Sequence, residues 1–203
     1  MLSINNVLQN IIDRVNRYSF LGERVFPSGT RLVGHIPHIG DLGHLHHLFS
    51  GLTEIEFQRL EIKFMLENYD VKDLKYFFLK FNGISLFDDA FNIFGLRGLE
   101  RTGMDKSWEP YSIYTPNISE RHSDALPQHF FFGAFQRHVT FNSMLYIDLN
   151  TLKYHECALG NSVKPHMSWD SLGEMLIYYF NLLEPCFDET GHRIATWRKP
   201  PIL

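Results

Sequence analysis

The stretch YDVKDLKYFFLKFNG, residues 69–83, joins a helical apolar pattern to a glycine that can end a helix. Four of its side chains are spaced as i, i+3, i+4 and i+7, which places them on one stripe of a helix: Leu74, Phe77, Phe78 and Phe81. Asp70 can cap the N-terminus of this helix. Asn82-Gly83 can end it, because glycine adopts the left-handed conformation there without a Cβ clash. We therefore expect a buried helix over 70–81, followed by a strand at 91–96.

Three further helices are expected, two before this stretch and one after it. Residues 4–18 carry apolar side chains at helical spacing after Ser3, which can act as a cap. Residues 53–68 begin with Thr53-Glu54-Ile55-Glu56, a capping box in which two side chains satisfy each other's backbone amides. Ser168 to Leu172 opens a last amphipathic helix, which continues to Leu183.

Strands are expected mainly in the second half of the chain. Their predicted ranges are 129–133, 144–149 and 153–158, and the last two are joined by a turn at Asn150-Thr151. Helices followed by strands and then by a helix is the order of an α+β protein, not of a βαβ alternation. The sequence therefore predicts the α+β fold class.

The order of these motifs resembles that of the SUKH superfamily. The shared pattern is a helix ending in Asn-Gly, a strand with Phe132-Gly133, a hairpin around Tyr146 to Leu149 and a helix opened by Ser168-Trp169. The resemblance runs from about Leu52 to Leu183 and implies a single largely antiparallel sheet packed against several helices. We expect the chain to form one SUKH-like domain over residues 1–203, with an N-terminal helix and a His/Gly-rich loop before the matching part. The resemblance also implies a binding protein that is not an enzyme, most often a bacterial immunity protein that sits on a toxin and blocks it.

The composition agrees with one domain. The chain has 203 residues, of which 44% are apolar and 18 are Phe, so one sizeable aromatic core can form. No signal peptide is evident, and no apolar run approaches the roughly 20 residues of a membrane span. The two cysteines, Cys157 and Cys186, suit a reducing compartment. We expect a cytoplasmic domain with no membrane partner and no cofactor.

The charge of the chain bears on its partner. Its formal net charge is −4, from 19 basic and 23 acidic residues. The basic residues are scattered and form no stripe, which argues against nucleic acid as a partner. Mild acidity fits a basic protein partner such as a nuclease, although the same charge is ordinary for a solvated surface. We expect a monomer or a weak dimer.

Residues 22–51 are rich in Gly and His and read as a long irregular loop with a short strand at 30–33. Five histidines there invite a metal site: His35, His38, His44, His46 and His47. If 42–49 is helical, His44 and His47 lie one turn apart on one face. No Cys lies near them and no HEXXH companion motif is present, so a histidine-rich surface loop is the competing interpretation. We assign no metal ligand.

His155 and Cys157 alternate on a predicted strand and should share a face. Such a pair can act as base and nucleophile. No third orienting group is evident, and free cysteines are often buried in cores. We therefore assign no catalytic residue.

A surface of acidic and aromatic residues is the best candidate for partner binding. Its members are Asp88, Asp89, Trp108, Glu109 and Tyr111. Trp and Tyr are enriched at interface hot spots, and acidic side chains steer basic partners. The alternatives are that Trp108 closes one edge of the core and that the 35–47 loop is the binding surface.

The functional hypothesis is an immunity protein that binds and neutralises a cognate toxin, with a nucleic-acid-targeting toxin as the favoured class. A regulatory or scaffold SUKH-like domain that binds a host protein is the first alternative. A histidine-ligated metal hydrolase is the second.

Overall fold

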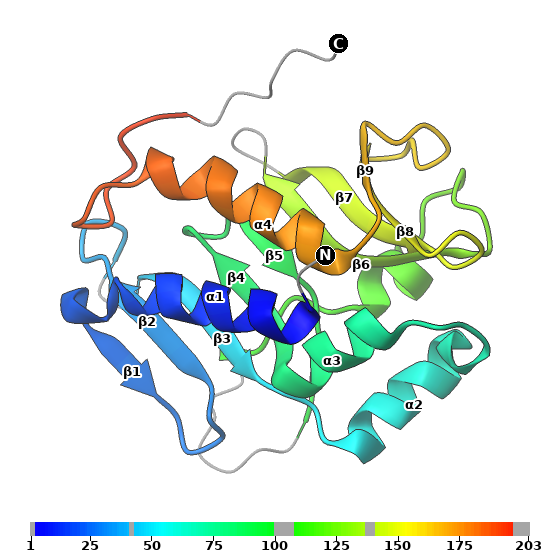
Figure 1. Ribbon diagram of the computed structural model, residues 1–203, viewed down its shortest axis with the longest axis horizontal. Helices are drawn as coiled ribbons and strands as arrows, with labels where there is room; N and C mark the ends of the chain where they lie inside the picture. The colour runs from blue at the N-terminus through cyan, green and yellow to red at the C-terminus, as the bar shows by residue number, and fades with distance from the viewer. Residues whose placement is uncertain (1–2, 41–42, 100–107, 137–140, 197–203) are drawn as a thin grey trace.

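A computed structural model describes residues 3–40, 43–99, 108–136 and 141–196. Within these ranges the chain forms a nine-stranded sheet in which every neighbouring pair is antiparallel and the strands follow chain order (Figure 1). The strands are β1 Glu23–Val25, β2 Arg31–His35, β3 His44–Ser50, β4 Phe81–Leu86, β5 Phe91–Ile93, β6 His129–Gln136, β7 Phe141–Asp148, β8 Lys153–Ala158 and β9 Met167–Trp169. The α+β class and the single antiparallel sheet are confirmed.

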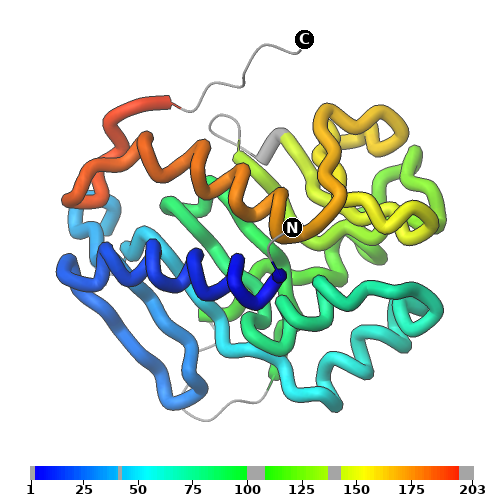
Figure 2. The backbone as a smooth tube through the Cα atoms, in the orientation of Figure 1, coloured from blue at the N-terminus to red at the C-terminus, as the bar shows by residue number. Residues whose placement is uncertain are grey.

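Four α-helices occur in the described ranges: α1 Ile4–Asn16, α2 Glu54–Phe64, α3 Lys72–Lys80 and α4 Leu172–Leu183. Short 3-10 helices lie at Ser19–Leu21, Leu66–Asn68 and Glu184–Cys186, and a π-helical turn lies at Thr115–Ser119. The first and last α-helices lie side by side in front of the sheet (Figure 2). Arg14 of α1 forms an ion pair with Glu184, directly after the end of α4, and its guanidinium lies 4.3 Å from the ring centre of Phe180 in α4.

The stretch 69–83 forms a helix and a strand in direct succession. Leu74, Phe77 and Phe78 of α3 are completely buried, as the helical stripe predicts. The helix ends at Lys80, so Phe81 is buried from β4 and not from the helix. The Asp70 cap is wrong: the helix begins at Lys72 without a side-chain cap, and Asp70 instead pairs with the Lys72 ammonium at 2.9 Å.

Gly83 has the positive φ that the sequence predicts, at +102°, but it does not end a helix. It lies inside β4, where a Cβ atom would stand 2.6 Å from the carbonyl oxygen of Ile93 in β5. The glycine is therefore required by close approach of two strands.

The other helices begin close to where their caps predict. Thr53 and Glu56 form the complete capping box of α2, which ends at Phe64 and not at Asn68 because Met65 is left-handed, with φ 55°. Ser3 caps α1 and Ser171 caps α4. The last helix therefore starts at Leu172, after Trp169 of β9.

The predicted loop over residues 22–51 is wrong, since β1, β2 and β3 lie within it. The expected strand at 30–33 corresponds to β2, but the range 42–49 is strand and not helix. The sequence of β3 is HLHHLFS, and the strand buries His46 as well as Leu45 and Leu48. Because a histidine occupies a buried position, the apolar pattern that predicts a strand is interrupted. The one-turn spacing argument for a metal site at His44 and His47 does not apply.

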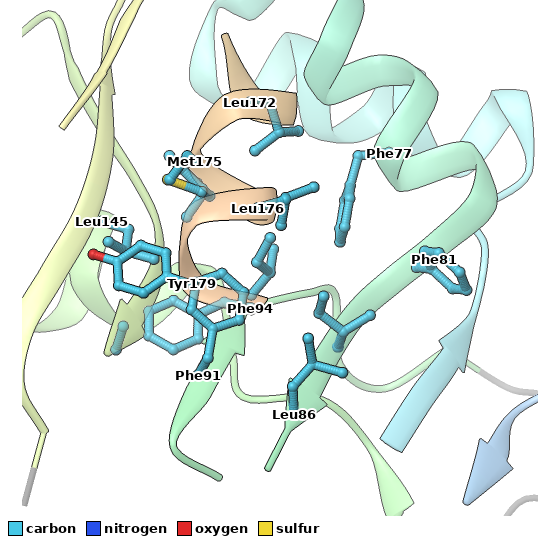
Figure 3. Packing of buried hydrophobic residues seen from close by; sticks show 14 of the residues in the cluster. Phe77, Phe81, Leu86, Phe91, Phe94, Leu145, Leu172, Met175, Leu176 and Tyr179 are labelled. Carbon is cyan, nitrogen blue, oxygen red and sulfur yellow. The ribbon is translucent and has the colours of Figure 1, made fainter. Parts of the chain in front are cut away.

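Helices cover one face of the central strands. Figure 3 shows Leu172, Leu176 and Tyr179 of α4 pointing toward the sheet, and the ring centres of Tyr179 and Phe91 are 4.8 Å apart. Side chains directly opposite one another on neighbouring strands share a face. The register therefore places on this helical face, in one row, His46, Leu86, Phe91 and Phe135.

No helix in the described ranges is long and apolar enough to cross a membrane. The buried apolar residues form one cluster that includes α1, α3, α4 and the central strands.

Candidate partner-binding site

The face of the sheet opposite the helices carries the candidate site. Because successive strand residues alternate, the neighbours of the helical-face row form a second row on this outer face. That row consists of His47, Ser85, Asn92, Ala134, Met144 and Cys157. Two neighbouring pockets lie over it, and the chain segment after β5 supplies their outer walls.

Two buried asparagine side chains hold this segment in place. The Asn82 amide donates to the Leu96 carbonyl and accepts from the Leu96 amide, both at 2.8 Å. Gly95 then pairs with the segment through Tyr111 and Ile113, at 2.8 and 2.9 Å. Asn117 clamps the far end to β6 by accepting from the Phe131 amide at 2.9 Å. The wall that carries the aromatic candidates is therefore anchored on the sheet at both ends.

The first pocket, called the acidic pocket here, has a volume of about 270 Å³. It is lined by His47, Phe49, Ser85, Asp89, Arg97, Trp108, Glu109, Pro110 and Tyr111. Four of the five residues singled out from the sequence thus meet in one cavity. The fifth, Asp88, is adjacent to it in the chain but does not line it.

Asp89 is oriented by the connection between β4 and β5. Phe87, Asp88 and Asp89 all have left-handed backbones, with φ of 56°, 53° and 60°. Each such residue costs about 1–2 kcal/mol, so the surrounding packing must hold this turn. Ser85 Oγ donates to one Asp89 carboxylate oxygen, and the Tyr111 hydroxyl approaches the other at 3.4 Å. Both donors are neutral, and within the described residues no cation pairs with Asp89.

Tyr111 stays a hydroxyl donor. Burial, followed by the negative charge of Asp89, raises its pKa to about 12. The residue is 45% exposed, so it forms a wall that a partner can touch.

Glu109 has a different role from the one expected of a steering charge. Its carboxylate accepts from Arg97 at 3.1 Å and from the Gly98 amide at 2.8 Å. Because Arg97 neutralises it, the uncompensated negative charge of the pocket belongs to Asp89. Glu109 instead helps to hold the wall of the pocket.

Trp108 packs edge-on against two histidines of β3. Its ring centre lies 5.8 Å from that of His47 and 6.5 Å from that of His44. Burial lowers the pKa of His47, against the opposing effect of Asp89, so this ring is neutral at pH 7. Its buried Nε2 has no hydrogen-bond partner in the described part of the chain. The wall of the pocket therefore contains a polar nitrogen that has no partner within the described residues but is itself shielded from solvent.

Asp88 lies on the exposed tip of the same turn. Partial desolvation of its carboxyl group, followed by the charge of Asp89, raises the pKa of Asp88, while His38 and Arg193 act in the opposite direction. His38 stacks on His192, with ring centres 3.8 Å apart. The exposed acidic tip and the pocketed carboxylate are therefore neighbours with different environments.

The second pocket, called the apolar pocket here, has a volume of about 290 Å³. It is lined by Phe94, Tyr111, Ser112, Thr115, Pro116, Glu120, His122, Ala134, Met144 and Leu159. Tyr111 lines both pockets and so separates them. Leu159 is 63% exposed at its rim, which leaves an apolar side chain facing solvent.

The other residues that were candidates for a metal or catalytic site do not form one in the described part of the chain. His46 is in the core and His38 is at a surface turn, and no group of three His, Cys, Asp or Glu in the described ranges is placed to hold a metal ion. Cys157 is completely buried, and burial raises its thiol pKa to about 12, so it is a poor nucleophile. His155 stacks on Tyr146 and bonds Ser168 at 2.7 Å.

Sequence reasoning considered His47 only as a metal ligand or as part of an alternative loop surface, and it missed the remaining lining residues Phe49, Ser85, Arg97 and Pro110. Reading HLHHLFS as an alternating strand would have placed His47 on one face with Phe49. No local signal connects that strand with Ser85, because their proximity comes from the register of β3 with β4.

Searches against models of protein families and against curated proteins find no match to this chain. The likeness to the SUKH superfamily therefore stays a prediction from motif order.

Proposed function

We propose that the chain is an immunity protein of the cytoplasm, which binds a cognate toxin and neutralises it by protein–protein contact. The observation that carries the proposal is the convergence of Asp89, Trp108 and Tyr111 in one pocket beside a second, apolar pocket. Aromatic anchors that enter or line pockets are the typical centre of a protein interface, and charges around them select the partner.

Charge complementarity favours a basic toxin domain. The chain carries a net charge of −4, and the carboxylate of Asp89 has no cationic partner in the described ranges. A nuclease or other nucleic-acid-targeting toxin presents a basic surface because it must attract phosphate. The same surface is attracted to an acidic inhibitor, which would compete with the substrate for it.

The test begins with the gene neighbourhood and ends with co-expression. A large toxin gene beside the gene for this chain supplies the partner, and its toxin domain is expressed alone or together with the chain. We expect co-expression to restore growth and the two proteins to co-purify as a complex. Loss of both rescue and complex formation with that toxin would contradict the proposal.

A matched pair of variants then tests the surface. Trp108→Ala should weaken rescue because it removes an aromatic wall of the acidic pocket. Tyr76→Ala is the control, since Tyr76 is 50% exposed on α3, away from the outer face of the sheet.

A further inference from the structure

Resting on the proposed function, we propose that the two pockets separated by Tyr111 take adjacent side chains of one partner segment. The acidic pocket takes a basic side chain, Arg or Lys, and the apolar pocket takes the apolar side chain next to it. This assigns to the partner a short recognition element of defined chemistry.

The acidic pocket has the groups that a guanidinium or ammonium group requires. The Asp89 carboxylate lines it, held by Ser85 and Tyr111 but not neutralised by a cation in the described ranges. Trp108 and Tyr111 provide aromatic walls, which attract a cation through the negative face of each ring.

The volume and the neighbouring charges agree with a single side chain. A pocket of about 270 Å³ is smaller than the usual site for a drug-sized ligand and is suited to one long side chain. Arg97 also lines the pocket, but Glu109 pairs with it at 3.1 Å. The net attraction for a cation therefore comes from Asp89.

The apolar pocket begins on the other side of the same tyrosine ring. Phe94, Ala134 and Met144 line it, and Leu159 stands at its rim. An apolar side chain placed there removes this surface from water, which stabilises binding roughly in proportion to the area covered. Since Tyr111 lines both cavities, a segment crossing it can fill both with neighbouring residues.

Small probes test this chemistry without the toxin. The protein is labelled with 5-fluorotryptophan, and its ¹⁹F spectrum is followed during titration with Nα-acetyl-arginyl-leucinamide. The matched probes are the citrulline analogue, which keeps the shape but lacks the charge, and the arginyl-glycinamide analogue, which lacks the apolar side chain. The Trp108 resonance reports on the acidic pocket, while Trp169 of β9 is the internal control.

We expect the Trp108 resonance to shift with the arginyl-leucinamide probe while that of Trp169 does not. The citrulline probe should bind at least about tenfold more weakly, and the glycinamide probe about tenfold more weakly. Asp89→Asn should make the arginine and citrulline probes bind alike while the leucine preference persists. Asn tolerates the left-handed backbone at this position, so the variant should keep the turn.

The control variant is Asp170→Asn, an exposed acid that pairs with Lys153 at 3.1 Å away from both pockets. It should retain the full preference for arginine. Equal binding of arginine and citrulline probes by the unaltered protein, no shift with any probe, or an Asp89→Asn variant that still prefers arginine would each overturn the inference. If any of these three outcomes occurs but the chain still rescues growth from the toxin, the inference about the pockets is wrong and the proposed function stands. If the probes bind selectively but the chain does not rescue growth, the proposed function is wrong and the pocket chemistry stands.

Discussion

At the scale of single residues, His46 is a polar side chain in the apolar core. The ring is completely buried, with ring centres of Phe87 at 4.8 Å and Tyr18 at 5.2 Å. Neither ring nitrogen has a hydrogen-bond partner in the described part of the chain. Burial, followed by the nearby His47, lowers its pKa to about 3. The residue is therefore neutral in the folded protein and acts as an imperfect aromatic core residue.

His46→Phe should raise the free energy of unfolding at acidic pH and reduce its pH dependence. In the unfolded chain His46 titrates near its ordinary pKa of 6.5. Between that pH and about 3 the unfolded state binds a proton that the folded state excludes, so stability falls as the pH is lowered. The contribution approaches about 1.4 kcal/mol per pH unit below 6, and Phe removes it. Denaturant unfolding at several pH values measures the slope.

The control for this experiment is His38→Gln, because His38 lies on the exposed turn. This variant should leave unchanged the slope of the free energy of unfolding against pH between about pH 4.5 and 6, which lies within the range where His46 contributes. Equal slopes for the unaltered protein and His46→Phe would show that His46 can be protonated in the folded state.

Gly83 gives a second prediction at this scale. Gly83→Val should cost at least about 2 kcal/mol, because it combines a positive φ with a Cβ atom 2.6 Å from the Ile93 carbonyl oxygen. Gly160→Val is the matched control: its φ is +75°, but no atom lies within 4 Å of its Cβ position. Chemical denaturation should show the smaller loss for Gly160. Equal losses would mean that backbone conformation alone accounts for the cost at Gly83.

At the scale of elements, α3 depends on its aromatic face. Phe78 is completely buried, and its ring centre lies 5.5 Å from that of Phe77 and 6.2 Å from that of Phe57 in α2. Phe78→Ala should cost roughly 3–5 kcal/mol through lost burial and the cavity that remains. Tyr76→Ala on the exposed face of the same helix should change stability by less than about 0.5 kcal/mol. A loss below about 1 kcal/mol for Phe78→Ala, measured by denaturant unfolding, would contradict this packing.

The helices could be predicted from the sequence because their signals are local. The Thr53–Glu56 capping box and the Leu74–Phe78 stripe each lie within two turns of one helix. The N-terminal strands could not, since all three residues of β1 are exposed and β3 buries a histidine. Asn82-Gly83 misled for a different reason. The glycine allows the close approach of β4 to β5 and the asparagine hydrogen-bonds Leu96, and neither role has a local signature.

The site divides in the same way. Residue type alone selected Asp89, Trp108 and Tyr111 as candidates, because acids and large aromatics have known roles at interfaces. Their convergence with His47 required the strand register and the anchoring of the wall by Asn82. The pair Asp88-Asp89 predicts a turn, which the structure has, but no glycine marks its left-handed backbone, so the sequence does not predict the orientation of the Asp89 side chain.

At the scale of the whole molecule, the two adjacent aspartates should affect different steps of binding to the toxin that we propose as the partner. Asp88 is exposed at the tip of its turn, where its charge acts on an approaching partner through solvent. Asp89 lines the acidic pocket, where its charge acts only after contact. Rim charges mainly change association, whereas buried polar contacts mainly change dissociation.

Asp88→Lys should therefore slow association with a basic toxin. The effect should shrink as salt is added, because ions screen exposed charges that are farther apart than the Debye length, about 10 Å at 0.1 M ionic strength. Asp89→Asn and Trp108→Ala should instead speed dissociation, with association changed by less than about threefold. Surface plasmon resonance at low and high salt separates the two rates, with Asp170→Asn as the charge control. If Asp88→Lys speeds dissociation at all salt concentrations, the turn is itself buried at the interface. If neither aspartate affects either rate, the toxin binds elsewhere. The surface to test next is then the one around His35, His38 and His44.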